Sequence, residues 1–360
     1  DGSLGELNEV VLESLLPKVG CRNSASTELS FGIKEGAEAY LVGKPYRGFH
    51  YISQIMSDTC IRVSVGAAAL ACQGYLYSLR YVPECSQRQL SIKNMPLSQS
   101  GRMLESADVR RMLLTQKSYS EGALALCLYA SSLKEDEKTA DTECERQRAA
   151  VLLDLLAPVV QSWPSKYGYI TNDLAMKILS EVGCFHDYPV EQLYRDQRIN
   201  SMHEGAEALY ALDLLIKKIP LQNQYGFDIF KQEVRMTLQR VNSTALLKEL
   251  FAPVNEALEC LNVVTSTLLH DIEKDPSLGL DTANLYLDMF GRVTMAWIWL
   301  RQALAACRSL GDDKQVLTQS EQDFYEEKLQ AARFYIEGDL PQVIRQADLL
   351  IDKNQLSFGM

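Results

Sequence analysis

The sequence has little of what metal binding, disulfide bonding or nucleic-acid binding requires. Only four of its 360 residues are histidines, and its nine cysteines contain no C-x-x-C pair. Neither a zinc ribbon nor a disulfide-based scaffold is therefore expected. Asp and Glu outnumber Lys and Arg by 47 to 36, which gives a net charge of −11. A chain this acidic has no electrostatic attraction to DNA, RNA or an anionic membrane surface, and an acidic ligand would need a local cluster of cations.

Long apolar segments are also missing. The longest stretch without a charged residue is 63–79, between Arg62 and Arg80, and it contains serine, glutamine and tyrosine. It is slightly short for a transmembrane helix, so we interpret it as a buried helix and expect no insertion into a membrane. The first residue is Asp1 and the residues after it are not signal-like, so we interpret the start as processed or truncated.

The composition is that of a globular protein, with 23% charged and 47% hydrophobic residues, and the length suggests about two domains. In the first part, short apolar or alternating runs at 10–12, 27–33 and 39–42 predict β-strands separated by turns. Two or three strands leave their edges and one face uncovered. We therefore interpret residues 1–47 as part of a β domain.

From Gly48 onward, apolar residues recur at spacings of three and four, which predicts helices. The expected helices are 48–82, 102–134, 142–162, 168–182, 190–218, 226–241, 243–272, 278–309, 318–337 and 340–352. Breaks are predicted at prolines, among them Pro83 and Pro164. The fold class is therefore mainly α, with residues 48–220 as a first helical bundle and 221–360 as a second helical domain.

Local patterns add expectations within these helices. The run VTMAWIWL at 293–300 is apolar around its whole circumference, as in the central helix of a bundle. Ser320 and Asp323 resemble a capping box. The charged run Lys134–Arg148 is most simply a solvated connection between helices. One apolar stripe is expected on 190–218, formed by Leu209, Leu212, Leu215, Ile216 and Ile219.

Most enzyme motifs are absent. His203-Glu204-Gly205 begins like a zinc-protease motif, but position 207 is Glu rather than the second His, so we expect no metal site. No G-x-G-x-x-G, G-x-x-x-x-G-K-[ST] or G-x-S-x-G sequence occurs. A dense polar pattern remains around Arg195 and Asp196. By residue type alone, these two side chains are best explained as structural groups that satisfy buried backbone or each other.

The same pattern also resembles the most characteristic segment of the flavin-dependent acyl-CoA dehydrogenases. Residues 222–340 resemble the extra C-terminal domain of the long branch of that family, which includes the methylthiopropionyl-CoA dehydrogenases. The resemblance implies part of the family's middle β domain, then its C-terminal four-helix bundle and an additional helical domain. The segments that carry it, in the family's order, are LPKVGCRNSASTELSF (16–31), EAYLVGKPYRGF (38–49), DTCIRVSVGAAAL (58–70), QKSYSEGALALCLYAS (116–131) and DYPVEQLYRDQRINSMHEGAEAL (187–209).

The resemblance also implies a chemistry. In this family a glutamate removes the α-proton of an acyl-CoA thioester while a hydride leaves the β-carbon for FAD, and by position that base is Glu204. Gly205 beside it and Arg62 correspond to the substrate side of the site. The resemblance further implies acyl-CoA as the substrate, a homodimer or larger assembly, and a reducing compartment such as the mitochondrial matrix or the bacterial cytoplasm.

The flavin-contacting positions depart from the family pattern. Lys177 stands where the family has glutamine, Ser180 and Glu181 replace two glycines, and Ala206 replaces the threonine after the catalytic Glu-Gly. Cys85 stands where an arginine reaches the cofactor's phosphates. The loss of an arginine removes a bidentate phosphate partner, and a carboxylate adds like-charge repulsion. Further departures are expected at Gln87–Gln89 and Ala208.

Two hypotheses follow. The first is an FAD-dependent acyl-CoA dehydrogenase, or a fragment or subunit of one, that uses Glu204 as the base. The second is a catalytically degenerate homologue that has lost FAD and serves as a structural or assembly subunit of a larger complex, for instance in mitochondria.

Overall fold

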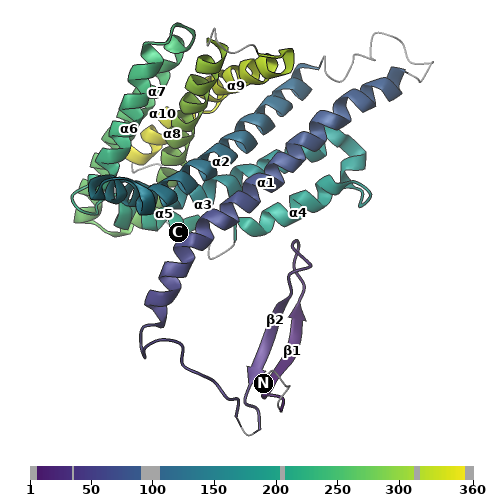
Figure 1. Ribbon diagram of the computed structural model, residues 1–360, viewed down its shortest axis with the longest axis vertical. Helices are drawn as coiled ribbons and strands as arrows, with labels where there is room; N and C mark the ends of the chain where they lie inside the picture. The colour runs from purple at the N-terminus through teal and green to yellow at the C-terminus, as the bar shows by residue number, and fades with distance from the viewer. Residues whose placement is uncertain (1–5, 35, 91–105, 203–206, 312–316, 353–360) are drawn as a thin grey trace.

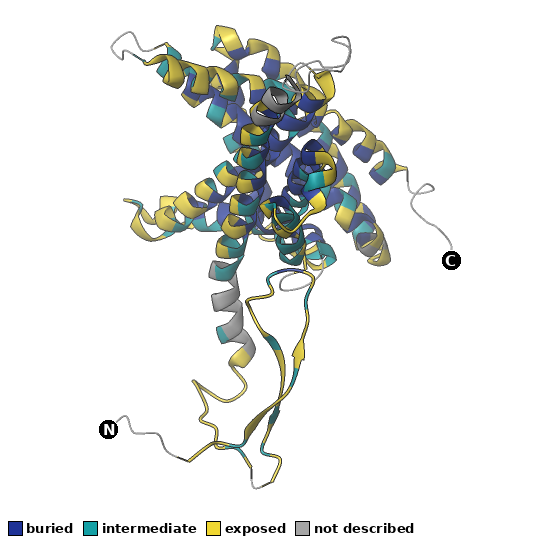
Figure 2. Cartoon of the chain, turned by 90° about the vertical axis from the view of Figure 1, so that its right-hand side faces the viewer, coloured by how far each residue is buried: buried dark blue, intermediate teal, exposed yellow. Residues whose placement is uncertain are grey.

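The computed structural model describes residues 6–34, 36–90, 106–202, 207–311 and 317–352. A β-hairpin at the N-terminal end stands beside a body of packed helices, and a connection that contains residues 36–47 joins the two (Figure 1). The buried residues gather in the helical body, whereas the hairpin is exposed along most of its length (Figure 2). The hydrophobic core is therefore helical.

The hairpin consists of β1 (Val10–Leu16) and β2 (Ser26–Phe31), which pair antiparallel with an irregularity between Leu12 and Ser14. Both expected strands are confirmed. The third expected strand, 39–42, is wrong, since this segment is irregular in the structure. Its side chains are exposed, and a strand forms only where its backbone groups pair with a neighbouring strand.

Four helices form the first part of the body: α1 (Gly48–Leu90), α2 (Ala107–Thr139), α3 (Glu143–Leu179) and α4 (Pro189–Asn200). Between α3 and α4 lies a short 3₁₀ segment, η2 (Ser180–Cys184). The predicted solvated connection in the charged run is confirmed, because α2 ends and α3 begins within it. At the start of α3, Thr142 and Glu145 form a capping box.

The predicted breaks at Pro83 and Pro164 are wrong. Pro83 lies inside α1, and α3 continues through both Pro158 and Pro164. A proline inside a helix removes one backbone hydrogen bond and costs about 3 kcal/mol. In α3 that cost is offset by burial of large side chains around it, such as Leu156 and Trp163, each worth about 1.5–3 kcal/mol.

The single helix expected at 190–218 is also wrong. The described residues form α4, α5 (Glu207–Leu212) and a π-helical turn, η3 (Asp213–Lys218). The wider π turn rotates the side chains that follow relative to an α-helical stripe. Of the expected stripe, Leu215 and Ile219 are buried, whereas Leu209 is 57% exposed.

The second part of the body is also helical. Its elements are α6 (Tyr225–Asn242), η4 (Ala245–Leu250), α7 (Phe251–Lys274), α8 (Ser277–Leu310), α9 (Gln319–Gly338) and α10 (Gln342–Ile351). The capping box expected at Ser320 and Asp323 is wrong by two residues. Thr318 caps α9 and pairs with Glu321, because Thr318 is the residue with extended backbone before the first turn.

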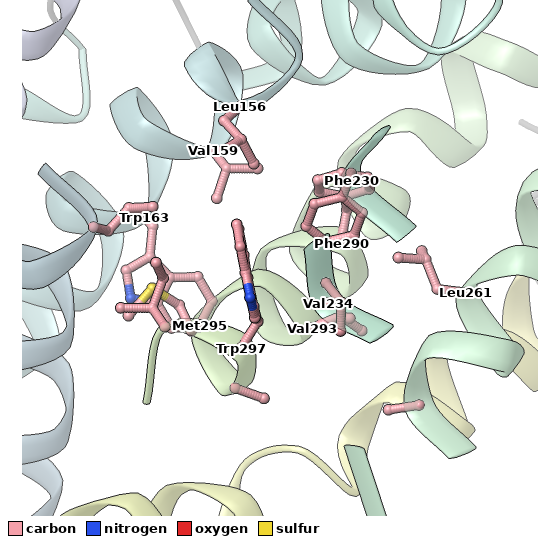
Figure 3. Packing of buried hydrophobic residues seen from close by; sticks show 14 of the residues in the cluster. Leu156, Val159, Trp163, Phe230, Val234, Leu261, Phe290, Val293, Met295 and Trp297 are labelled. Atoms are coloured by element: carbon pink, nitrogen blue, oxygen red, sulfur yellow. The ribbon is translucent and has the colours of Figure 1, made fainter. Parts of the chain in front are cut away.

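The central position of α8 is confirmed, since every residue of 293–300 is buried. Figure 3 shows Trp297 of α8 among side chains from three other helices: Leu156 and Val159 of α3, Phe230 of α6 and Leu261 of α7. The indole nitrogen of Trp297 donates to the hydroxyl of Thr237 at 2.9 Å. Helices on both sides of the predicted boundary at 220 thus share one hydrophobic cluster, and the boundary itself stays a prediction.

None of the helices in the described parts of the chain is long and apolar enough to cross a lipid bilayer. The eight cysteines that the structure describes are all free thiols.

Candidate functional site

The predicted base and two of its neighbours, Glu204, Gly205 and Ala206, lie outside the described residues. The site is therefore built from the elements on either side of them. Before it, α4 ends at Asn200; after it, α5 begins at Glu207. Both helices contact α3.

The start of α5 is held on α3 by two polar contacts. The Nζ of Lys166 lies 3.2 Å from Oε1 of Glu207, the first residue of α5. One turn later, the Nε2 of Gln161 donates to the hydroxyl of Tyr210 at 2.5 Å. Gln161 and Lys166 both belong to α3, so α3 supports α5 at two points.

Lys166 also reaches the second part of the body. Its Nζ lies 2.8 Å from Oδ1 of Asp288 on α8. Burial by itself would raise the pKa of Asp288, but the charges of Lys166 and Arg292 outweigh burial and lower that pKa to about 2. For Lys166 burial lowers the pKa, and the carboxylates of Asp288 and Glu207 outweigh it, so that the pKa is raised. Both groups are charged at neutral pH.

Asp288 belongs to a buried polar network between helices. The Nε of Arg292, one turn later on α8, donates to Oδ2 of Asp288 at 3.0 Å, and its other nitrogens donate to Tyr167 at 2.8 Å and to Asp339 at 3.2 Å. Tyr119 donates to the same oxygen of Asp339 at 2.7 Å. The network thus connects α2, α3 and α8 with the end of α9.

On the other side of the site, α4 holds the turn of the hairpin. The backbone nitrogen of Cys21 donates to Oδ1 of Asp196 at 2.6 Å, and a guanidinium nitrogen of Arg195 donates to the carbonyl of Val19 at 3.0 Å. A Cβ on Gly20 would lie 2.2 Å from the carbonyl oxygen of Arg195, so only glycine allows this approach. The structural explanation of Arg195 and Asp196 is confirmed: they bind backbone, not each other.

Arg195 is oriented by a charged neighbour. Its Nε donates to Oε2 of Glu191 at 2.8 Å, one turn earlier on α4. Hydrogen bonds from Arg195, and to a lesser extent from His186, hold the pKa of Glu191 down to about 2 despite its burial. The ion pair therefore persists throughout the neutral range and fixes the guanidinium that reaches the hairpin.

Arg62, predicted on the substrate side, is an exposed residue of α1. It lies in the same helical turn as Cys60, whose Sγ donates to Oε1 of Gln161 at 2.6 Å. Because Gln161 also binds Tyr210, the turn of α1 that contains Arg62 lies at the level of α5. The role of Arg62 on the substrate side stays a prediction.

The predicted flavin positions lie elsewhere. Lys177, Ser180 and Glu181 are exposed at the C-terminal end of α3, and at about 1.5 Å per residue Lys177 is roughly 16 Å along the helix from Lys166. The structure therefore groups these three residues with one another and does not bring them to α5. The side chains of Cys85 and Gln87–Gln89 lie outside the described residues.

The sequence argument did not identify Lys166, Asp288 or Arg292. One signal was present: each is a charged residue inside an otherwise apolar helix segment, SWPSKYGYI or LYLDMFGRV. Charged residues are seldom buried without a partner. That signal indicates buried pairs, but it does not say which residues form them, because Lys166 and Asp288 are far apart in the sequence.

Comparison with known proteins shows what the chain is related to. The family model described as acetyl-CoA dehydrogenase C-terminal-like matches residues 230–360. The broad-specificity linear acyl-CoA dehydrogenase FadE5 of Mycobacterium tuberculosis is 28% identical over 355 residues, which cover 94% of this chain. The 3-methylmercaptopropionyl-CoA dehydrogenase of Ruegeria pomeroyi is 25% identical over 310 residues and covers 85% of it. The chain is thus similar to acyl-CoA dehydrogenases along most of its length, and its C-terminal part matches the family model.

The alignments cover 57% of the mycobacterial protein and 51% of the Ruegeria protein. The chain thus spans about half the length of the curated acyl-CoA dehydrogenases that it matches. The resemblance read from the five sequence segments is confirmed by these relatives.

Solved structures of acyl-CoA dehydrogenases and related proteins have a similar fold. The crystal structure of Caenorhabditis elegans ACDH-11 in complex with C11-CoA has a TM-score of 0.73 at 18% identity, covering 99% of this chain and 56% of that one. An acyl-CoA dehydrogenase complexed with FAD from Bacillus anthracis has a TM-score of 0.66 at 16% identity, covering 95% and 60%. These likenesses confirm the fold class: the helical C-terminal part of an acyl-CoA dehydrogenase with a remnant of the middle β domain.

No group of three or more His, Cys, Asp or Glu side chains in the described part of this acyl-CoA dehydrogenase homologue is arranged to hold a metal ion.

Proposed function

We propose that this chain contributes the base and part of the acyl-CoA site of an FAD-dependent acyl-CoA dehydrogenase. Its similarity to acyl-CoA dehydrogenases, with Glu204 at the position of the base, carries the proposal. Further support comes from α5, the helix that follows Glu204 in the sequence. It is held by α3, and Gln161 of α3 also binds Cys60, in the turn of α1 that contains Arg62.

The proposed reaction removes a proton from Cα of an acyl thioester and a hydride from Cβ, and leaves a 2-enoyl-CoA with FAD as the hydride acceptor. A carboxylate takes so weakly acidic a proton only if its own pKa is raised and the developing enolate receives hydrogen bonds. In this proposal Glu204 is the base, Gly205 leaves room for the thioester, and Arg62 lies on the substrate side.

The predicted flavin positions do not fit a pyrophosphate by charge. Lys177 supplies one cation, but its Nζ lies 2.6 Å from Oδ2 of Asp173, and Glu181 adds a second carboxylate to this end of α3. The three charges leave a net negative end, which repels phosphate. The backbone fits better, since Ser180 has φ 57° and ψ −136°, a conformation that glycine adopts readily.

Flavin reduction tests the proposal. The purified chain is loaded with FAD, freed of excess cofactor and mixed with butyryl-CoA without oxygen while the visible flavin absorption is followed. The unmodified chain should bleach. Glu204→Gln should bind FAD and acyl-CoA but bleach at least about 10²-fold more slowly, the usual effect of losing a general base. Bleaching of this variant at the unmodified rate would refute the assignment of Glu204.

A matched control is Glu326→Gln, which changes an exposed carboxylate on α9 that accepts a hydrogen bond from Gln322 at 2.9 Å. It should bleach like the unmodified chain, since α9 lies outside the proposed site.

The charge at the end of α3 favours a second candidate, a homologue that has lost FAD and acts as a structural or assembly subunit. In this case the chain would stay colourless after incubation with FAD while remaining folded. Light scattering coupled to size-exclusion chromatography separates the candidates further: a yellow homodimer supports the enzyme, and a colourless chain that requires another protein to remain soluble supports the subunit.

A further inference from the structure

We propose that Lys166 and Asp288 are positioning residues that tie α5 to α8, so that the C-terminal helices determine where the helix after the proposed base lies. The catalytic part of this inference rests on the proposed function. The tether, which is the contact of Lys166 with both Glu207 and Asp288, involves described residues and can be tested without an activity measurement.

Helix α5 is too short to hold its own position. It has six residues and passes directly into a π-helical turn. Isolated helices shorter than about 12–15 residues are marginal in water, so that tertiary contacts must stabilise them. The polar contacts of α5 with α3 are those of Glu207 and Tyr210, one at its first residue and one a turn later.

Lys166 is held in place from the other side. Its ammonium group lies between the carboxylates of Glu207 and Asp288, at 3.2 and 2.8 Å. A lysine has a flexible stem and loses much rotamer freedom when it is fixed. The ion pair with Asp288 already fixes the Lys166 side chain, so little further rotamer freedom is lost when Lys166 contacts Glu207. The pair Lys166–Asp288 thus preorganises the contact to α5.

Asp288 cannot move freely. Its Oδ1 accepts from Tyr167 at 2.8 Å in addition to Lys166, and its Oδ2 accepts from Arg292 at 3.0 Å and from Gln346 of α10 at 2.6 Å. The carboxylate is thus bound by groups from α3, α8 and α10. A displacement of these helices would change the position of Lys166 and, through it, of α5.

Hydrogen exchange measured by mass spectrometry on the whole chain tests the tether. Glu207→Ala removes the α5 end of the contact, and because alanine is the best helix former, the intrinsic helix propensity of α5 does not fall. We expect amides within 208–218 to exchange at least about 5-fold faster, with exchange in α7 unchanged. Lys166→Met should accelerate exchange within 208–218 to the same extent. The double variant with both substitutions should exchange no faster there than either single variant.

A matched control is Lys231→Met, which removes a lysine of α6 that lies 2.9 Å from Asp228 and 3.1 Å from Asn262. It should leave exchange within 208–218 unchanged. Unchanged exchange there in Glu207→Ala, or an equal acceleration in every helix, would overturn the proposal, since the first shows no tether and the second shows only a general loss of stability.

The catalytic part has its own readout. In a chain that shows flavin bleaching, Glu207→Ala should lower kcat about 10-fold or more while KM stays within about 2-fold, because a misplaced base impairs reaction more than binding. An unchanged kcat would overturn the catalytic part. If the unmodified chain does not react, the proposed function fails, and the exchange experiment still decides on the tether.

Discussion

At the scale of single residues, the buried charges carry the most consequence. Arg292 is 7% exposed and binds Asp288, Asp339 and Tyr167 at once. Burying a charge is unfavourable unless all its partners are present. The network therefore adds less to stability than the number of its hydrogen bonds suggests. Removing one member, however, leaves its partners buried without a group that compensates their charge.

Arg292→Met should lower the free energy of unfolding by about 3–5 kcal/mol, because it leaves the buried carboxylate of Asp339 without its cation and Asp288 with Lys166 alone. Urea denaturation measures this loss. The matched control is Arg146→Met, which breaks a solvent-exposed pair with Glu143 and should change stability by at most about 1 kcal/mol. Equal effects of the two substitutions would show that the network is not buried as described.

Asp288 should also make stability depend on acid pH. Its pKa is lowered from 3.8 to about 2 in the folded chain, so its contribution is fully present above the unfolded pKa and is lost as pH falls through about 2. Asp339 acts in the opposite direction, since burial raises its pKa. Denaturation of Asp288→Asn between pH 5 and pH 2 (about the range in which carboxylates titrate) should show a shallower loss of stability than the unmodified chain. A loss as steep as that of the unmodified chain would contradict the lowered pKa.

Ser180 is a residue in a glycine-like conformation, with φ 57° and ψ −136°. Such strain costs about 1–3 kcal/mol in a non-glycine residue, whereas glycine loses about 1 kcal/mol through the freedom of the unfolded chain. Ser180→Gly should therefore raise the free energy of unfolding by up to about 2 kcal/mol. Ser131→Gly, inside α2, should lower it by about 0.5–1 kcal/mol. A destabilised Ser180→Gly would show that the turn is not strained.

At the scale of elements, the apolar pattern of the sequence predicted burial correctly where the residues of one helix are sufficient to indicate it. Residues 293–300 are apolar on every side and lie buried in α8, as expected. The sequence pattern gave wrong predictions where contacts with a neighbouring helix determine the local structure. Pro164 stays inside α3 because the surrounding core offsets its cost, and the stripe through Leu209 is interrupted by a π-helical turn. The contact between Lys166 and Glu207 was beyond prediction, since it depends on how two helices cross.

The docking of the hairpin on α4 is a property of two elements and depends on Gly20. Because a Cβ there would lie 2.2 Å from the backbone oxygen of Arg195, Gly20→Ala should separate the turn from α4. Hydrogen exchange should then be at least about 10-fold faster at the amide of Cys21, which loses its bond to Asp196. Gly48→Ala, whose Cβ would meet nothing within 4 Å, should leave this amide unchanged. An unchanged Cys21 amide in Gly20→Ala would contradict the contact.

At the scale of the whole molecule, the similarity to acyl-CoA dehydrogenases was predictable from the sequence, because five separated segments kept the order found in that family. The mainly helical fold was predictable from the apolar residues that recur at spacings of three and four after Gly48. What the sequence could not supply is the continuity of the core: α3 and α8 come from different predicted domains, yet Trp163 and Trp297 belong to one hydrophobic cluster (Figure 3). This shared core is the physical reason why the C-terminal helices can influence the site.

The central claim, that Glu204 is a base directed at an acyl thioester, is tested most directly by exchange of the α-protons of butyryl-CoA in deuterated water. Mass spectrometry of the recovered thioester measures the deuterium gained, and the experiment is run with and without FAD because proton removal needs no hydride acceptor. We expect deuterium at Cα with the unmodified chain and at least about 10²-fold slower incorporation with Glu204→Gln. Incorporation at equal rates in both, or none in the unmodified chain with the thioester bound, would contradict it.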